Sequence, residues 1–312
     1  MRKKVFLHIG MHKTATTWLQ EYFFPSIKCS LSYNDEPSYT FLMNVFRYNM
    51  RKEDIEYAKS HFSNLKNDKF FSAEIMCGNL FDGYSNFKTQ ISVLKEIFSD
   101  YDIYIIFVSR LPSEWLVSAY RESFFEHHYC EFDEFLCKSS FLKSNYHTNS
   151  IPKMLEFLKF QFGDRVCHLQ FEQFKNDRNK FMKELCSFLN ASIDVVPRNA
   201  PNNVGYSNNA IKILLLLQKY LRSSGAQILL PDPIEFFGKK SIYLIEEKKY
   251  RGRLGKVLRK VFYLQRRGNW LRFFMRQLDK MILRRTQQVE LRHNFSHELR
   301  ELDADYIKML KK

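Results

Sequence analysis

The sequence predicts an α/β fold in which a parallel β-sheet is flanked by helices. Short apolar runs rich in β-branched and aromatic residues recur along the chain, and residues 103–108 (IYIIFV) are the clearest of them. Segments with apolar residues three and four apart follow these runs. Strands that alternate with helices are typical of a parallel sheet covered on both sides. No internal repeat or low-complexity linker divides the chain, so we expect a single domain over residues 1–312.

Each predicted element is marked by its own pattern. Four buried strands are predicted, at residues 4–9, 70–73, 103–108 and 165–171. Three helices are predicted after the first, third and fourth of these strands, at residues 14–25, 112–124 and 174–188. The first helix ends at Pro25, and the second begins at Pro112, a residue that suits the first turn of a helix.

Composition limits the class of protein. With 312 residues, of which 45% are hydrophobic and 27% charged, the chain has the profile of a globular protein with a sizeable core. No apolar run approaches the roughly 18 residues of a membrane span, and residues 5–7 already belong to a strand, which leaves no room for a signal peptide. The six cysteines are scattered without a C-x-x-C pair, which favours reduced thiols in a cytoplasmic protein over disulfides or zinc.

The net charge of +15 is concentrated near the C-terminus. Residues 239–285 hold sixteen Lys and Arg against three acidic residues, which gives +13, so the chain divides into an α/β core at 1–222 and a basic, mainly helical part at 223–312. Within 253–285 apolar residues recur at helical spacing among the basic ones, as in a helix that lies on an anionic membrane surface. An ordinary helix packed on the core would show the same stripe. No recognised nucleic-acid motif accompanies the charge, so nucleic acid is not expected as a partner.

The most informative segment is the turn after the first predicted strand, HIGMHKTATTW at residues 8–18. A strand that leads into a helix leaves backbone N–H groups and the positive end of the helix dipole at the turn, where anions bind. Lys13 adds a charge, and Thr14, Thr16 and Thr17 add hydroxyl donors, so the cluster favours a phosphate. A threonine cap beside a solvated lysine is the alternative.

A nucleoside-triphosphatase loop, G-x-x-x-x-G-K-[ST], fits this turn poorly. His12 stands where the glycine before Lys13 should be. The strand at 103–108 runs into Ser109-Arg110 rather than into an Asp that would hold Mg²⁺. An ATP-dependent kinase is therefore the alternative enzyme. A basic protein that binds a membrane or nucleic acid without catalysis is the alternative outside enzymes.

In two motifs the chain resembles the sulfotransferases that use 3′-phosphoadenosine 5′-phosphosulfate (PAPS), and it is most similar to bacterial-like members of the carbohydrate branch. The first motif is Lys13-Thr14-Ala15-Thr16-Thr17-Trp18, similar to the family's K-[ST]-G-T-[TS] followed by W. The second is Arg110 with Ser118 in SRLPSEWLVSAY, an Arg at a strand end and a Ser eight residues on. A looser likeness continues through residues 171–189. Ala15 departs from the family's glycine, and its methyl group fits readily only with a negative φ.

The resemblance implies a P-loop-like sulfotransferase fold and a nucleotide site built from both motifs. Lys13 and the turn residues 14–17 would hold the 5′-phosphate, and Lys13 would neutralise charge as the phosphate–sulfate bond breaks. Arg110 and Ser118 would hold the 3′-phosphate, which distinguishes PAPS and its product PAP from other adenine nucleotides. Trp18 would pack either on the adenine or in the core. No metal is expected, because Lys13, Arg110 and backbone dipoles would neutralise the charge.

The acceptor hydroxyl needs a base, and the resemblance points to Glu74. The small-molecule branch of the family uses a His in a THLP-like segment, and no such segment occurs here. Instead, FFSAEIMCG puts Glu74 just past a predicted strand, similar to the Ser-x-Glu arrangement of the carbohydrate branch. A glutamate at a strand end can also be merely solvated, and His8 and His12 near the turn are the reserve candidates. The pair at 127–128 lacks a third ligand in register and is not expected to bind metal.

The sequence therefore predicts a cytoplasmic, PAPS-dependent sulfotransferase in which Glu74 and Lys13 are catalytic. The expected reaction is in-line transfer of a sulfuryl group to a hydroxyl of a carbohydrate or glycolipid acceptor. Peripheral binding at the inner face of an anionic membrane, through residues 253–285, is a further expectation.

Overall fold

A computed structural model of the chain describes residues 2–65, 67–80, 83–123, 132, 135, 150–193, 211, 215 and 296–311. The chain forms two compact units. The first comprises Met1–Trp115, Cys137–Asn202 and Arg300–Lys312, and the second comprises Leu116–Leu136 and Asn203–Leu299. The basic stretch at 239–285 and the histidine pair at 127–128 lie outside the described residues.

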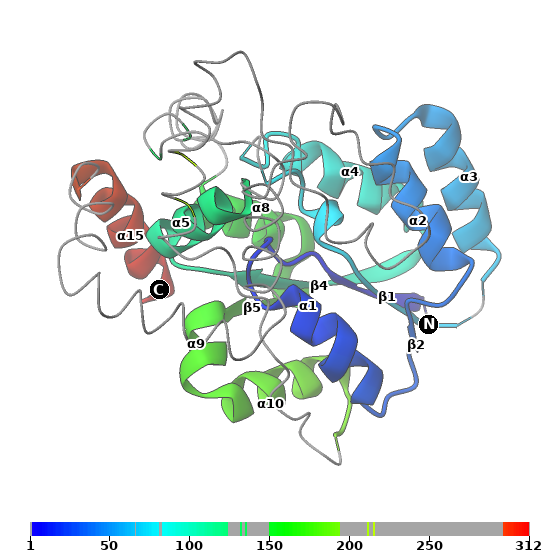
Figure 1. Ribbon diagram of the computed structural model, residues 1–312. Helices are drawn as coiled ribbons and strands as arrows, with labels where there is room; N and C mark the ends of the chain where they lie inside the picture. Colours follow the sequence, from blue (N-terminus) through cyan, green and yellow to red (C-terminus); the bar gives the residue numbers. More distant parts are fainter. Residues whose placement is uncertain are drawn as a thin grey trace, which may run out of the picture. The chain divides into compact units, whose positions relative to one another are not determined.

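The predicted parallel sheet is confirmed, and it forms the centre of the first unit (Figure 1). Five strands, all paired in parallel, follow the order β2-β3-β1-β4-β5. Their bounds are Lys3–His8 (β1), Ser32–Tyr33 (β2), Lys69–Ser72 (β3), Tyr101–Ser109 (β4) and Val166–Gln170 (β5). The four predicted strands are all present, whereas β2 is too short to give a sequence pattern.

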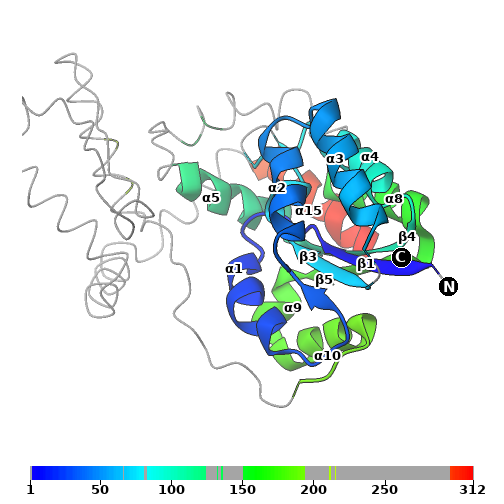
Figure 2. The same cartoon turned by 90° about the vertical axis from the view of Figure 1, so that its right-hand side faces the viewer.

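Helices cover both faces of this sheet. Their bounds are Thr16–Trp18 (α1), Ser38–Arg47 (α2), Lys52–Ser63 (α3), Phe87–Ile97 (α4), Pro112–Ser123 (α5), Ile151–Phe162 (α8), Phe171–Asn176 (α9), Arg178–Leu189 (α10) and Ser296–Leu310 (α15), with single turns at Glu74–Met76 (η3) and Gly163–Arg165 (η5). Helices α1, α9 and α10 lie on one face, and α3, α4 and α8 lie on the other (Figure 1, Figure 2). This two-sided cover is the predicted α/β architecture.

One predicted helix changes its winding along its length, and another is broken. The helix expected at 14–25 runs without interruption from Thr16 to Ser26, as an α turn followed by a π-helical stretch at Leu19–Phe23 (η1) and a 3₁₀ turn at Phe24–Ser26 (η2). The helix expected at 174–188 is split into α9 and α10 at Asp177, whose φ of −142° is extended. The Asp177 carboxylate accepts a hydrogen bond from Lys180 N at 3.0 Å. An aspartate in this position caps the start of a new helix, which explains the break.

The strands end together at one edge of the sheet. Their central residues are fully buried, among them Val5, Leu7, Phe71, Ile105 and Phe107, as expected for a parallel sheet covered on both faces. Strand β1 pairs with both β3 and β4 through its last residue, His8, so the three carboxyl ends lie side by side. Ligands of α/β sheets bind at this edge. Lys13, Glu74 and Arg110 each follow one of these three strands.

Candidate active site

The turn after β1 has the backbone geometry of an anion-binding loop. Its start is fixed to β4, because Met11 N donates to Val108 O at 3.1 Å. Lys13 and Ala15 then have positive φ angles, 67° and 65°, and Thr14 between them does not. Alternating backbone conformations of this kind turn successive N–H groups toward one concave side, which binds anions. This backbone suits the phosphate-binding role predicted for the turn.

Ala15 is strained in this turn. Its φ of 65° and ψ of 20° are left-handed, a conformation in which the Cβ crowds the following carbonyl at a cost of about 1–2 kcal/mol. The negative φ that would suit the methyl group is therefore not found. Glycine, the usual residue in the family that the sequence resembles, would be unstrained at this position.

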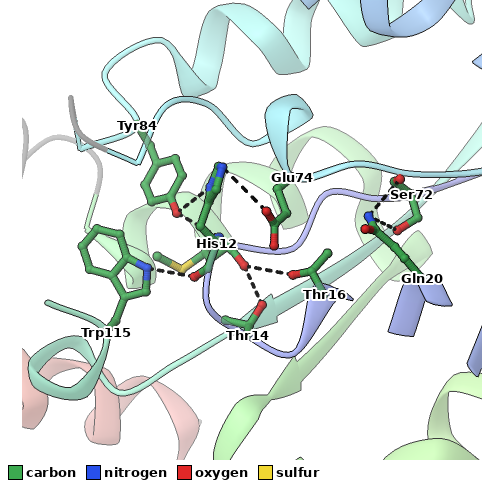
Figure 3. Close-up of polar contacts among 9 residues, drawn as sticks. His12, Thr14, Thr16, Gln20, Ser72, Glu74, Tyr84 and Trp115 are labelled. Atoms are coloured by element: carbon green, nitrogen blue, oxygen red, sulfur yellow. Dashed lines mark hydrogen bonds and ion pairs between the residues drawn. The ribbon is translucent and has the colours of Figure 1, made fainter. Parts of the chain in front are cut away.

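The threonine side chains stiffen the turn from within (Figure 3). Thr14 Oγ1 donates to Met11 O at 2.6 Å, and Thr16 Oγ1 reaches the same oxygen at 3.4 Å. Both threonines are buried, whereas Thr17 is exposed. The hydroxyl groups of Thr14 and Thr16 thus bond within the turn, and what these residues offer an anion is their backbone N–H.

Arg110 brings the two sequence motifs together. It directly follows β4, and its Nη1 donates to the carbonyl oxygen of Lys13, 97 residues earlier, at 3.1 Å. Its guanidinium also lies over the ring of Phe171, 4.6 Å from the centroid, and its Nη2 donates to Glu114 at 3.3 Å. The side chain is still 17% exposed. The arginine predicted for one phosphate therefore contacts the turn predicted for the other.

Glu114 is a site residue that the sequence analysis missed. Its carboxylate is shared between Arg110 and Lys175, whose Nζ lies 2.9 Å away. Burial raises the pKa of Glu114, but the hydrogen bond and charge of Lys175, together with those of Arg110, outweigh it and leave the pKa below its usual value. Glu114 is therefore ionised at neutral pH and holds both cations beside the ring of Phe171. The sequence feature that could have identified Glu114 is its position four residues after Arg110, a spacing at which opposite charges pair.

Glu74 and His12 form a second pair at the same edge (Figure 3). Glu74 begins η3 just after β3, and its Oε2 lies 3.8 Å from His12 Nε2. The hydroxyl of Tyr84 accepts a hydrogen bond from His12 N at 3.1 Å and lies 3.3 Å from His12 Nδ1. The indole of Trp115 donates to His12 O at 3.1 Å. The predicted base and one of its reserve candidates are therefore neighbours.

Both members of this pair reach solvent, whereas Tyr84 and Trp115, which contact His12, are buried. The side chains of His12 and Glu74 are 24% and 30% exposed, so an acceptor molecule can approach them. Tyr84 is fully buried, and its burial raises the pKa of its phenol well above the usual value, so the hydroxyl stays protonated. Neither Tyr84 nor Trp115 was predicted to contact the turn.

His8, the other reserve candidate, lies in the interior. It is fully buried, its Nδ1 lies 2.7 Å from Ser72 Oγ, and burial lowers its pKa to about 3. Gln20 Nε2 donates to the same hydroxyl at 3.1 Å, and Ser72 N donates to Asn34 Oδ1 at 2.9 Å. His8 also explains Gly10, where a Cβ would lie 2.6 Å from His8 Nε2. His8 thus supports the turn from beneath and does not face an acceptor.

Trp18 and Ser118 are the remaining predicted residues. The indole of Trp18 is 8% exposed, lies 5.0 Å from the ring of Phe174 and 6.1 Å from that of Phe23, and is covered by the guanidinium of Arg178 at 5.1 Å. Trp18 therefore packs in the core, which is one of the two roles that the sequence allowed. Ser118 is half-buried on α5, in the second unit.

Three further findings concern the described part of the chain. No three His, Cys, Asp or Glu residues in it come together as a metal site requires. Four cysteines in it, Cys29, Cys77, Cys167 and Cys186, are free thiols. None of its helices is both long and apolar enough to cross a bilayer.

Comparison with known proteins gives distant structural likenesses. No family model and no curated protein matches the chain. The sulfotransferase of Alicyclobacillus acidocaldarius is 18% identical, with a TM-score of 0.44 and coverage of 71% of this chain and 94% of that one. Mouse sulfotransferase SULT7A1, complexed with PAP, is 13% identical, with a TM-score of 0.39 and coverage of 91% and 86%. The sulfotransferase domain of the curacin biosynthetic pathway is also 13% identical, with a TM-score of 0.34 and coverage of 62% and 76%. At such low identities and TM-scores, what this chain does must follow from its own residues.

Proposed function

We propose that the protein is a PAPS-dependent sulfotransferase that transfers a sulfuryl group to a hydroxyl of a carbohydrate or glycolipid. The observation that carries the proposal is the hydrogen bond from Arg110 Nη1 to Lys13 O at 3.1 Å. It joins two cationic elements, each at the end of its own strand, within one small site. A nucleotide with phosphates on both sides of its ribose needs two such elements, whereas AMP needs one.

The turn after β1 binds the 5′-phosphate of PAPS. This phosphate carries the sulfuryl group that is transferred. The N–H groups of the turn and the ammonium of Lys13 stabilise the charge that grows on this phosphate as its bond to sulfur breaks. The oxygen of the acceptor hydroxyl forms a new bond to sulfur on the opposite side, and PAP leaves in line. Arg110 holds the 3′-phosphate, and its Nε–H has no acceptor among the described residues, which leaves a donor for a phosphate oxygen.

Glu74 accepts the proton of the acceptor hydroxyl. Its carboxylate is 30% exposed at the carboxyl edge of the sheet, next to the turn that would hold the donor nucleotide. His12 supports it from 3.8 Å, and Tyr84 and Trp115 hold His12 in place. A base in this position contributes roughly a factor of 10²–10⁴ to the rate.

The acceptor class is inferred from the sequence around Glu74. The segment Ser72-Ala73-Glu74 resembles the Ser-x-Glu arrangement of sulfotransferases that modify carbohydrates. The basic stretch at 253–285 adds a docking site for an anionic membrane on the cytoplasmic side, where a lipid-linked glycan would be presented.

The proposed function is tested by nucleotide binding. Titration calorimetry compares PAP, AMP and ATP in the absence of Mg²⁺, and ATP again in its presence. Charge-assisted hydrogen bonds contribute about 1.5–3 kcal/mol, so PAP should bind about 10- to 100-fold more tightly than AMP. Arg110→Ala should remove most of this preference.

A matched control is Arg165→Ala. Arg165 is also a partly exposed arginine with one ion pair, to Asp102 at 3.2 Å, but it precedes β5 at the opposite edge of the sheet. This variant should keep the preference for PAP. Equal affinities for PAP and AMP in the unmodified protein would contradict the proposal, and tight binding of ATP with Mg²⁺ would favour the kinase instead.

A further inference from the structure

The C-terminal helix makes a hydrogen bond on each side of Arg110, one to a side chain and one to the backbone. Tyr306 of α15 has its hydroxyl oxygen 2.8 Å from Ser109 Oγ. One turn earlier on the same helix, Asp303 Oδ1 accepts a hydrogen bond from Ser113 N at 3.0 Å. The two contacts span 197 and 190 residues of sequence. They therefore tie the ends of a five-residue segment, 109–113, to a distant part of the chain within the first unit.

Strand β5 and helix α9 complete this support. His168 Nε2 lies 2.7 Å from Ser109 Oγ, so Tyr306, Ser109 and His168 form a continuous chain of hydrogen bonds. Leu111 N donates to Glu172 Oε1 at 3.1 Å. Tyr306 is only 1% exposed, and burial raises the pKa of its phenol, so the hydroxyl stays protonated. Hydrogen bonds in such a low-dielectric setting hold their residues firmly, because losing one leaves a buried group unpaired.

We propose that Tyr306 and Asp303 are positioning residues for Arg110 and thereby set the preference for a nucleotide with a 3′-phosphate. This inference rests on the proposed function. The contacts of the guanidinium with Lys13 O, Glu114 and Phe171 hold the far end of the side chain. Helix α15 holds the residues that flank Arg110 in the chain, through the Ser109 hydroxyl and the backbone N–H of Ser113. Hydrogen bonds from arginine to phosphate depend on both ends being placed to within a few tenths of an ångström.

If Tyr306 and Asp303 only stabilised the fold, losing them would not change the preference for PAP specifically. Two matched residues distinguish this stabilising role from the positioning role. Tyr101 is another buried tyrosine whose hydroxyl makes one hydrogen bond, to Phe62 O at 3.0 Å, away from the site. Asp177 is another aspartate that accepts from a first-turn N–H, that of Lys180 at 3.0 Å. Loss of either side chain should lower stability without moving Arg110.

The experiment measures the ratio of the AMP and PAP dissociation constants, together with the thermal midpoint of each variant without ligand. Tyr306→Phe and Asp303→Ala should each lower this ratio about three- to tenfold, the fold-change of one lost hydrogen bond. Asp303→Asn keeps an oxygen acceptor for Ser113 N and should restore the ratio. Tyr101→Phe and Asp177→Ala should lower the midpoint and leave the ratio unchanged.

The possible failures are distinguishable. If the unmodified protein does not prefer PAP to AMP, the proposed function is wrong and this inference falls with it. If the preference is present but survives both Tyr306→Phe and Asp303→Ala, only the positioning role is wrong. A ratio that falls equally in the Tyr101 and Asp177 controls would also overturn the positioning role, because general destabilisation would then explain it.

Discussion

Acid should weaken the fold through His8, the histidine beneath the turn that follows β1. Burial lowers its pKa to about 3, against an ordinary value of 6.5, because the charged form has no solvent around it. Between these two values the unfolded chain binds a proton that the folded chain does not. The contribution of His8 to the free energy of unfolding therefore falls as the pH drops below 6.5, by about 1.4 kcal/mol per pH unit, and levels off near pH 3. At pH 5.0 the loss is about 2 kcal/mol.

The assay is urea unfolding at pH 7.5 and pH 5.0, followed by circular dichroism, on the unmodified protein and on His8→Asn. Asparagine is small enough for the site, keeps a polar group near Ser72 Oγ and does not titrate. The variant is less stable at both pH values, so the quantity of interest is the change between them. That change should be about 2 kcal/mol smaller in His8→Asn than in the unmodified protein.

A control separates titration from simple destabilisation. Val5→Ala removes buried apolar volume from the same strand, where Val5 is 0% exposed, and adds no titrating group. Its loss of stability between pH 7.5 and 5.0 should equal that of the unmodified protein. An equal pH-dependent loss in His8→Asn would refute the reasoning, since His8 would then not be the group that takes up the proton.

Three further predictions concern the turn, the base and the basic stretch. Ala15→Gly relieves left-handed strain of about 1–2 kcal/mol but raises the entropy of the unfolded chain by about 0.4–1 kcal/mol, so urea unfolding should show a net gain of about 0.5–1 kcal/mol; a destabilised variant would argue against the strain. Glu74→Gln should lower turnover with PAPS by roughly 10²–10⁴ while calorimetry shows unchanged PAP affinity, and near-normal turnover would exclude Glu74 as the base. Residues 253–285 should bind anionic but not zwitterionic vesicles in co-sedimentation at low salt. Binding should be weaker after reversal of the charges at 259–260 and 266–267. Absence of binding would favour a role of this stretch in the folded core or in contact with a soluble acceptor.

The sequence alone predicts the parts of this protein that have a local signature. Strand β4 is a run of β-branched and aromatic residues, and β1 is an apolar run that stops at Gly10, so both were predictable from a few neighbouring residues. The turn with Lys13 was predictable for the same reason, because its donors are consecutive in the chain. Parallel α/β topology then brings the carboxyl ends of the strands to one edge of the sheet, which places Glu74 and Arg110 at the same edge.

Local conformations that depend on packing were not predictable. The positive φ of Ala15 contradicts the preference of an alanine, and it persists because Thr14, Thr16 and the pairing of Met11 with β4 hold the turn around it. The break at Asp177 interrupts an apolar spacing that reads as one helix, because periodicity records which face is buried and not whether the backbone is continuous.

Only the tertiary structure decided which residues meet. It brings Arg110 onto the carbonyl of Lys13, sets His12 beside Glu74, and locks Ser109 and Ser113 to Tyr306 and Asp303 of the C-terminal helix. It also removes His8 from the candidates for the base by burying it. Contacts between residues tens to nearly two hundred positions apart leave no periodic trace in a single sequence, because they depend on where whole strands and helices pack and not on the residues beside each partner.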